Sequence, residues 1–388
     1  MKGLLRAWGW GEYAVSLAVR GLGVLLVLLA SALIATISIA YLGVVAPLQA
    51  SAWRRAVHFA WFGWCMLNCV FNYAMTIVTD AGSPKTEEYR RLIEELRPPN
   101  DDVETGTLLG GGGLVGGEPA SGARMRRGAA RAEGSDDDED AWREHVDVYG
   151  WLKNRPYEWG LCTHTMLVKP PRSHYDHITR QLVLSMDHFC PWVCNCVGYL
   201  NYRYFCLFVF WTWLGCITIV LNAAPAMHLL APLRQHADSL AATRALVTAL
   251  APSGALPSSM VRLTHGERGA LRAWAAWTPF GARDARLLLS NAKMLAFAVG
   301  ISLTFFSVFH LILVLTGQTT IEFWGNWAAW MSSRAKGQVW KGRPFDEGLT
   351  ANWRRVFGSR NPILAVAIPS CRRPPFPPFP WPPPLAFR

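Results

Sequence analysis

Long apolar runs without charged residues alternate with polar stretches along this chain. There are four such runs, at residues 21–45, 57–78, 205–227 and 294–315. Each is long enough to cross a hydrocarbon core of about 30 Å as an α-helix. The pattern predicts an all-α membrane protein with four transmembrane helices, which places both chain ends on the same side of the membrane.

The segments before and between the first runs differ in character. Residues 1–20 mix basic and aromatic side chains, which predicts an interfacial anchor on the cytosolic side. Residues 100–140 hold glycine runs, a basic patch and an acidic cluster, so we expect a disordered insertion with too little apolar surface to fold. Residues 150–203 have mixed polarity and predict a small cytosolic domain between the second and third helices.

Two further segments complete the chain. Residues 228–291 are predicted to form a lumenal loop, because the four spans place this connection opposite the chain ends. Residues 316–388 are predicted to form a cytosolic tail. Proline dominates residues 374–384, so we expect that part to be extended polyproline II without a core.

Charge and cysteine content narrow the possible functions. The formal net charge is +11, and the basic residues flank the apolar runs. This distribution favours contact with membrane lipids or with a phosphate-bearing substrate, and it argues against nucleic acid as a partner. There are nine cysteines, too few for a disulfide scaffold, and residues 190–196 hold three of them. We therefore expect reduced, reactive thiols on a cytosolic face.

The densest chemistry lies in residues 186–205. Asp187 can orient His188, and His188 can take a proton from Cys190, which is the acid, base and nucleophile arrangement of covalent catalysis. The same residue types are also metal ligands, so half of a metal site is the alternative interpretation at this point.

The motifs around this stretch resemble those of the DHHC-type protein S-palmitoyltransferases. In the family's order they are residues 79–82 (with the family's proline replaced), 169–174, 186–193, 195–198, 201–205, 319–322 and 352–358. The resemblance implies a four-helix bundle with a cytosolic cysteine-rich domain between helices two and three. It also implies transfer of a fatty acyl group from palmitoyl-CoA to a motif cysteine and then to a client protein. By position, Cys190 is the acylated nucleophile, His188 its general base and Asp187 the residue that orients His188.

Four further residues are candidates for binding acyl-CoA. Lys169, Arg172 and Arg203 suit the CoA phosphates, since a basic face attracts a polyanion. Contact with lipid headgroups and surface ion pairs are the alternatives for these three. Trp192 is expected either to line the reaction face or to pack structurally.

The family's two structural zinc sites, built from six cysteines and two histidines, are largely missing here. Aligned without gaps, the first falls on Cys162, Thr165, Tyr175 and Leu182, and the second on Asp176, Thr179, Phe189 and Cys196. Only Cys162 and Cys196 keep thiols, and Leu and Phe cannot bind zinc. We therefore expect both family zincs to be absent, with Tyr175, Leu182 and Phe189 packed in an apolar core. One improvised zinc remains open, with ligands from Cys162, His164, His174, His177 or Cys194.

The missing ligands also favour catalysis over a metal site at residues 187–190. The leading interpretation is a protein-cysteine S-acyltransferase with an acyl-enzyme on Cys190. Its partners are expected to be membrane-associated client proteins with cytosolic cysteines, in the endoplasmic reticulum, the Golgi or the plasma membrane. A catalytically inactive DHHC-like membrane scaffold is the alternative, and a channel or transporter is disfavoured because the runs lack charges. Cys194 is interpreted as a neutral substitution, and His310 as a hydrogen bonder in helix packing.

Overall fold

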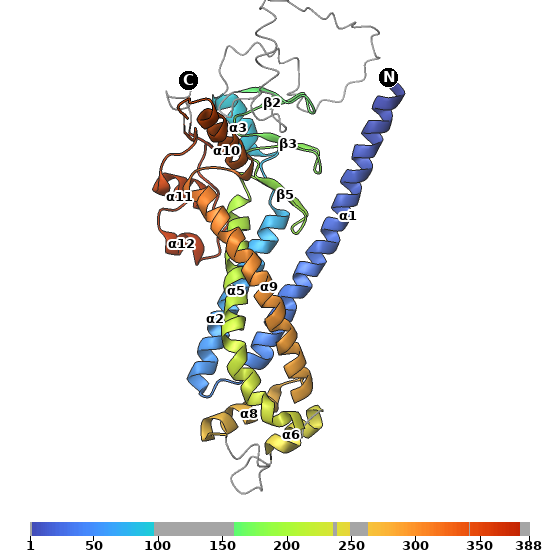
Figure 1. The fold of residues 1–388 in the computed structure, drawn as a ribbon, viewed down its shortest axis with the longest axis vertical. Helices are drawn as coiled ribbons and strands as arrows, with labels where there is room; N and C mark the ends of the chain where they lie inside the picture. The colour runs from blue at the N-terminus through green and yellow to red at the C-terminus, as the bar shows by residue number, and fades with distance from the viewer. Residues whose placement is uncertain (1, 97–158, 236–238, 249–262, 341, 381–388) are drawn as a thin grey trace, which may run out of the picture.

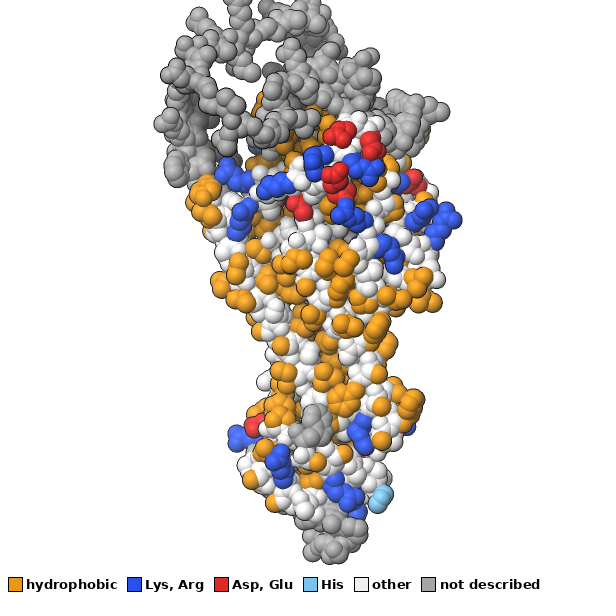
Figure 2. All heavy atoms as spheres, turned by 180° about the vertical axis from the view of Figure 1, so that it is seen from behind, with side chains coloured by type: hydrophobic (Ala, Val, Ile, Leu, Met, Phe, Trp, Pro, Cys, Tyr) orange, Lys and Arg blue, Asp and Glu red, His pale blue; other side chains and the backbone are white. Residues whose placement is uncertain are grey.

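Four long helices dominate the computed structural model, which describes residues 2–96, 159–235, 239–248, 263–340 and 342–380. They are α1 (Lys2–Ala40), α2 (Ala52–Val78), α5 (Tyr202–Leu230) and α9 (Ala282–Leu315). All four are long and apolar enough to cross a membrane. Hydrophobic side chains cover the middle of the molecule, and Lys and Arg side chains gather toward its two ends (Figure 2). The predicted helical fold with four membrane spans is confirmed.

The helices run further than the apolar runs that predicted them. α1 includes residues 2–20, the predicted anchor, and passes at Ala40 into a π-helical turn, η1 (Tyr41–Val45). α9 begins at Ala282, so the last part of the predicted loop is helical. Charged side chains are compatible with helix outside the hydrocarbon core, where water solvates them. Charge therefore marks the edge of a span and not the end of a helix.

A small domain of three β-hairpins lies between α2 and α5. Its described strands pair antiparallel: β1 (Gly160–Leu161) with β2 (Val168–Lys169), β3 (His174–Asp176) with β4 (Gln181–Val183), and β5 (His188–Cys190) with β6 (Asn195–Val197). Within the described chain each hairpin is a separate two-stranded sheet. These strands add to the predicted all-α class, and they are too short for an alternating pattern to reveal them.

Short helices close the end of the bundle opposite the hairpins (Figure 1). They are η2 (Ala231–Gln235), α6 (Leu240–Thr248) and α8 (His265–Trp277). Trp274 of α8 is fully buried, and its indole N–H donates to the carbonyl of Gly43 at 3.1 Å. The described part of the predicted loop 228–291 is therefore mostly helical, because its apolar faces bury against the ends of the membrane helices.

The C-terminal part of the chain packs beside the hairpins, at the same end as the start of α1 (Figure 1). It comprises α10 (Thr320–Ala335), α11 (Leu349–Phe357) and α12 (Pro362–Val366), with α3 (Glu87–Leu96) nearby. The prediction that the proline-rich end lacks a core is wrong for its described part, because Phe379 is 0% exposed. An extended backbone still presents side chains, and phenylalanines between prolines bury large apolar areas. The predicted insertion 100–140 lies outside the described residues.

The N-terminal half of α1 contacts the turns of two hairpins. The hydroxyl of Ser16 donates to the carbonyl of Ile178 in the β3–β4 turn at 2.7 Å. Gly23 lies against Cys194 of the β5–β6 turn, where a Cβ on the glycine would be only 2.7 Å from the cysteine Sγ. α1 thus reaches from the membrane to the domain without interruption.

Candidate active site

The thiol predicted to react lies at the end of a strand. Cys190 is the last residue of β5, and a tight turn leads from it to Asn195, its partner in β6. The turn is closed by the backbone N–H of Val193, which donates to the carbonyl of Cys190 at 3.2 Å. Cys190 is 7% exposed, so the hairpin shields the thiol from most of the solvent.

The β5–β6 hairpin is bound to the end of α2. The amide of Asn195 donates to the carbonyls of Thr76, Ile77 and Thr79, at 3.1, 3.2 and 2.9 Å. Carbonyls at the C-terminal end of a helix have no intrahelical partner, so this amide satisfies groups that α2 leaves free. As a result, Cys190 is held at the end of a membrane-spanning helix.

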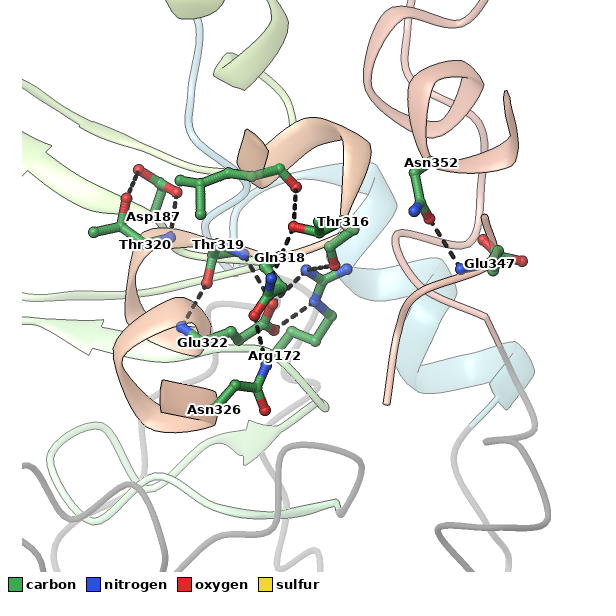
Figure 3. A network of polar contacts seen from close by, with 12 residues as sticks. Arg172, Asp187, Thr316, Gln318, Thr319, Thr320, Glu322, Asn326, Glu347 and Asn352 are labelled. Carbon is green, nitrogen blue, oxygen red and sulfur yellow. Dashed lines mark hydrogen bonds and ion pairs between the residues drawn. The ribbon is translucent and has the colours of Figure 1, made fainter. Parts of the chain in front are cut away.

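The carboxylate of Asp187 is held from two sides. It accepts a hydrogen bond from Nδ1 of His188 at 2.7 Å. It also accepts hydrogen bonds from the backbone N–H and Oγ1 of Thr320 at 2.7 and 2.8 Å, which Figure 3 shows. Burial by itself raises the pKa of Asp187, but the hydrogen bonds and the charge of His188 lower that pKa below its ordinary value. An ionised carboxylate fixed in this way orients the imidazole and stabilises its protonated form.

His188 interacts with both Asp187 and Cys190. Burial lowers the pKa of the His188 imidazole, but the hydrogen bond and charge of Asp187, together with those of Cys190, raise it to about 9. The ring also meets Phe205 edge-on, with the centroids 5.1 Å apart. At neutral pH the ring is therefore mostly an imidazolium, which places a positive charge beside the Cys190 sulfur.

Apolar side chains from the membrane helices surround Cys190. The thiol belongs to one buried cluster with Tyr73 of α2 and with Phe205 and Val209 of α5. The hydroxyl of Tyr73 donates to the carbonyl of Trp192 at 2.8 Å, which ties the turn to α2. The side chain of Trp192 is 45% exposed. An acyl chain on this thiol would lie against apolar surface and away from water.

The candidate phosphate ligands are placed differently from one another. Arg172 forms a buried ion pair with Glu322 and also donates to the carbonyl of Gly317 at 3.0 Å. Arg203 donates to the carbonyl and the hydroxyl of Ser370 and stacks on a neighbouring tyrosine. Arg172 therefore joins the domain, and Arg203 the start of α5, to the C-terminal part of the chain. Lys169 is partly buried on β2, and this burial lowers its pKa.

Thr320 is a further candidate site residue, because it binds Asp187. The signal for it is the motif at residues 319–322, but only the fold shows that α10 begins against Asp187. A second polar pair lies close by: the hydroxyl of Tyr202 and Nδ1 of His310 are 3.1 Å apart. His310 thus makes the predicted hydrogen bond between packed helices, and its ring also lies 6.1 Å from that of His188.

Two comparisons with known proteins agree with this geometry. Residues 156–326 match the model of the DHHC palmitoyltransferase family. This stretch of the chain is similar to the domain of that family. Its motif reads Asp187-His188-Phe189-Cys190, so the third position differs from the histidine in the family's name.

The chain is also similar to proteins named palmitoyltransferases. It is 27% identical to Palmitoyltransferase ZDHHC16A of Danio rerio over 227 residues, which cover 55% of this chain and 56% of the relative. It is 28% identical to Palmitoyltransferase ZDHHC15A of Danio rerio over 208 residues, 54% of this chain and 48% of the relative. A shorter match, 45% identical over 58 residues, is to Palmitoyltransferase ZDHHC2 of Homo sapiens and covers 15% of this chain and 16% of the relative. The chain spans about half the length of the first two relatives.

The residues at the family's first zinc position do not fit a metal. Tyr175 and Leu182 pair directly across the β3–β4 hairpin, and Leu182 is fully buried in an apolar cluster that includes Cys162. A leucine side chain offers no ligand, and tetrahedral zinc needs four donors. The donor set at this position therefore does not suit zinc.

The second zinc position is occupied by other interactions. The carboxylate of Asp176 accepts hydrogen bonds from the N–H and the hydroxyl of Thr179, at 2.8 and 2.5 Å. Phe189 pairs with Cys196 across the β5–β6 hairpin. Burial, and next the charge of Asp176, raise the pKa of the Cys196 thiol, whereas zinc binds the thiolate. No group of three or more His, Cys, Asp or Glu residues in the described ranges could hold a metal ion.

Proposed function

We propose that this DHHC chain is a protein-cysteine S-acyltransferase that moves a fatty acyl group, such as palmitoyl, from acyl-CoA to client proteins. The observation that supports this best is the connected series from Thr320 through Asp187 and His188 to Cys190, placed where an apolar cluster of membrane helices meets the domain. The clients are membrane-associated proteins with cytosolic cysteines.

In the first step, His188 holds the Sγ proton of Cys190 on the ring nitrogen that does not face Asp187, and Cys190 reacts as the thiolate. The thiolate attacks the carbonyl carbon of the acyl thioester, and the bond from that carbon to the CoA sulfur breaks. The CoA sulfur leaves as a thiol with the proton that His188 held. Asp187 keeps the imidazole oriented and stabilises its charge throughout.

In the second step, a client thiol gives its proton to His188 and attacks the acyl group on Cys190. The thioester bond to Cys190 breaks, and the Cys190 sulfur takes the proton back. Both steps exchange one thioester for another, so the mechanism needs no oxidant or added energy source.

The orientation follows from the substrates. CoA is dissolved in the cytosol and the client thiols face it, so the hairpin end of the molecule faces the cytosol. The membrane is an endomembrane (endoplasmic reticulum or Golgi) or the plasma membrane. Lys169 and the exposed Trp192 are our candidates for contact with acyl-CoA. Arg172 and Arg203 instead stabilise the fold through their contacts with Glu322 and Ser370.

Labelling with an alkyne-tagged palmitoyl-CoA tests the proposal. We expect a label on the purified protein that hydroxylamine removes, that Cys190→Ser abolishes and that Cys194→Ser retains. Equal labelling of the wild type and Cys190→Ser would refute the assignment of the nucleophile. An unlabelled but folded wild type would support the alternative, an inactive DHHC-like scaffold, which the intact series around Cys190 disfavours.

A further inference from the structure

The three hairpins of the domain need a cross-link other than strand pairing. In the described chain no ladder joins one hairpin to the next, and an isolated two-stranded hairpin is only marginally stable in water. The positions aligned with the family's zinc ligands alternate between hairpins. The first set joins the β1–β2 turn to β3–β4, and the second joins β3–β4 to β5–β6. Two zincs at these positions would tie successive hairpins together, and this chain lacks the ligands for them.

Side-chain packing takes the place of the first cross-link. The ring of His164, from the β1–β2 turn, stacks on Tyr175 of β3, with centroids 4.4 Å apart and planes at 11°. His177 meets both rings edge-on at 5.0 Å. Beside this stack, Cys162 and Leu182 are buried in one apolar cluster. Aromatic and aliphatic contacts therefore lie where the first metal would be.

Residues from the C-terminal part of the chain complete that cluster. Phe345 and Phe379 are both buried in it, and their rings lie 6.1 Å apart. Phe376 packs against the same cluster and lies beneath the guanidinium of Arg91 of α3, 4.3 Å from ring centroid to Cζ. The core of the hairpin domain is thus built partly by side chains that follow it by more than 140 residues.

Polar contacts hold this segment, residues 371–380, along its length. Tyr199, which follows the last hairpin, donates to the carbonyl of Pro375 at 2.9 Å. Arg355 of α11 donates to the carbonyl of Pro377 at 2.8 Å. Arg373 forms an ion pair with Glu88 of α3 at 2.6 Å. The segment therefore joins the hairpins, α3 and α11.

We infer that residues 371–380 do for this domain what the family's zincs do for theirs: they close its core and join its parts. The domain is then independent of metal, and its stability depends on the C-terminal segment. This inference concerns how the domain is held together and does not depend on whether Cys190 transfers acyl groups.

Metal content and stability of the purified full-length protein test the inference. We expect well below one zinc per chain by elemental analysis, and the same midpoint of thermal unfolding before and after prolonged incubation with a strong zinc chelator. We expect Phe379→Ala to lower the midpoint and to make the hairpins more accessible to protease. Phe305→Ala is the matched control, because Phe305 is 74% exposed and loses few contacts.

Clear outcomes would overturn the inference. One is two zincs per chain together with unfolding by the chelator. Another is a Phe379→Ala protein as stable as the Phe305→Ala control. If Phe379→Ala does not fold, Phe379→Leu is the second variant, because it keeps most of the side-chain volume. Phe379→Leu should fold with a smaller lowering of the midpoint of thermal unfolding. An unchanged midpoint for Phe379→Leu also contradicts the inference. None of these measurements depends on acyl transfer. A failure of this inference can therefore be distinguished from a failure of the proposed function.

Discussion

The buried ion pair between Arg172 and Glu322 should behave as a unit. The two groups meet at two N–O distances of 2.6 Å, and their side chains are 6% and 3% exposed. Removing one partner leaves the other charge buried and unpaired, which costs about 3–5 kcal/mol. We therefore expect Arg172→Met to lower the free energy of unfolding by about that amount. In Arg172→Met/Glu322→Met neither charge remains. The expected cost is then about 1–2 kcal/mol, from the hydrogen bonds that Thr319 and Gly317 lose.

Denaturant unfolding in detergent, followed by tryptophan fluorescence, measures these differences. The Michaelis constant for acyl-CoA, measured on the same variants, separates the structural role of Arg172 from a role in phosphate binding. If Arg172 binds a CoA phosphate, the single and double variants should raise this constant alike. If it only pairs with Glu322, the double variant should recover both stability and substrate affinity. The reasoning would be refuted if the double variant lost as much stability as Arg172→Met and Glu322→Met lose together. The two groups would then act independently.

Three further predictions follow from the site. Thr320→Val removes the hydroxyl bond to Asp187 and keeps the backbone one. It should slow enzyme acylation by about ten- to a hundredfold at unchanged acyl-CoA affinity, because a hydrogen bond to a charged group contributes about 1.5–3 kcal/mol. Thr320→Ser should retain the rate in the same labelling assay. Because the pKa of His188 is raised to about 9, its positive charge is present at neutral pH and is lost as the pH rises through 9. Acylation should therefore fall above that pH, and Asp187→Asn should move the fall to lower pH. Gly23→Ala places a Cβ 2.7 Å from the Sγ of Cys194 and should lower the midpoint of thermal unfolding. Adding Cys194→Ala should restore the midpoint. A Gly23→Ala protein of wild-type stability would contradict the close contact.

The spans could be predicted, and the candidate catalytic residues singled out, because their signals are local. An uncharged apolar run specifies a membrane helix by its own length, whatever the rest of the chain does. Asp187, His188 and Cys190 lie within four consecutive positions, so a single strand and its first flanking residue bring them together. The small strands lack such a signal, since two or three residues show no periodicity.

The partners of the site residues could not be predicted, because they lie far away in the sequence. Thr320 follows Asp187 by 133 residues, and Glu322 follows Arg172 by 150. A motif gives the residue types, but it does not show which acidic side chain will pair with which basic one in the folded protein. Arg172 therefore suits a phosphate equally well on sequence grounds, and only the fold shows that a carboxylate already occupies it.

The unbroken course of α1 connects the active site to the thickness of the membrane. The helix has 39 residues and is about 58 Å long at 1.5 Å per residue. A helix longer than the hydrocarbon core tilts to match it, and the tilt changes with the bilayer. Because Ser16 and Gly23 of the same helix touch the turns of two hairpins, a change of tilt moves the turn that follows Cys190. We therefore expect acylation rates in vesicles to vary with lipid chain length, so that one enzyme works at different speeds in thin and thick membranes.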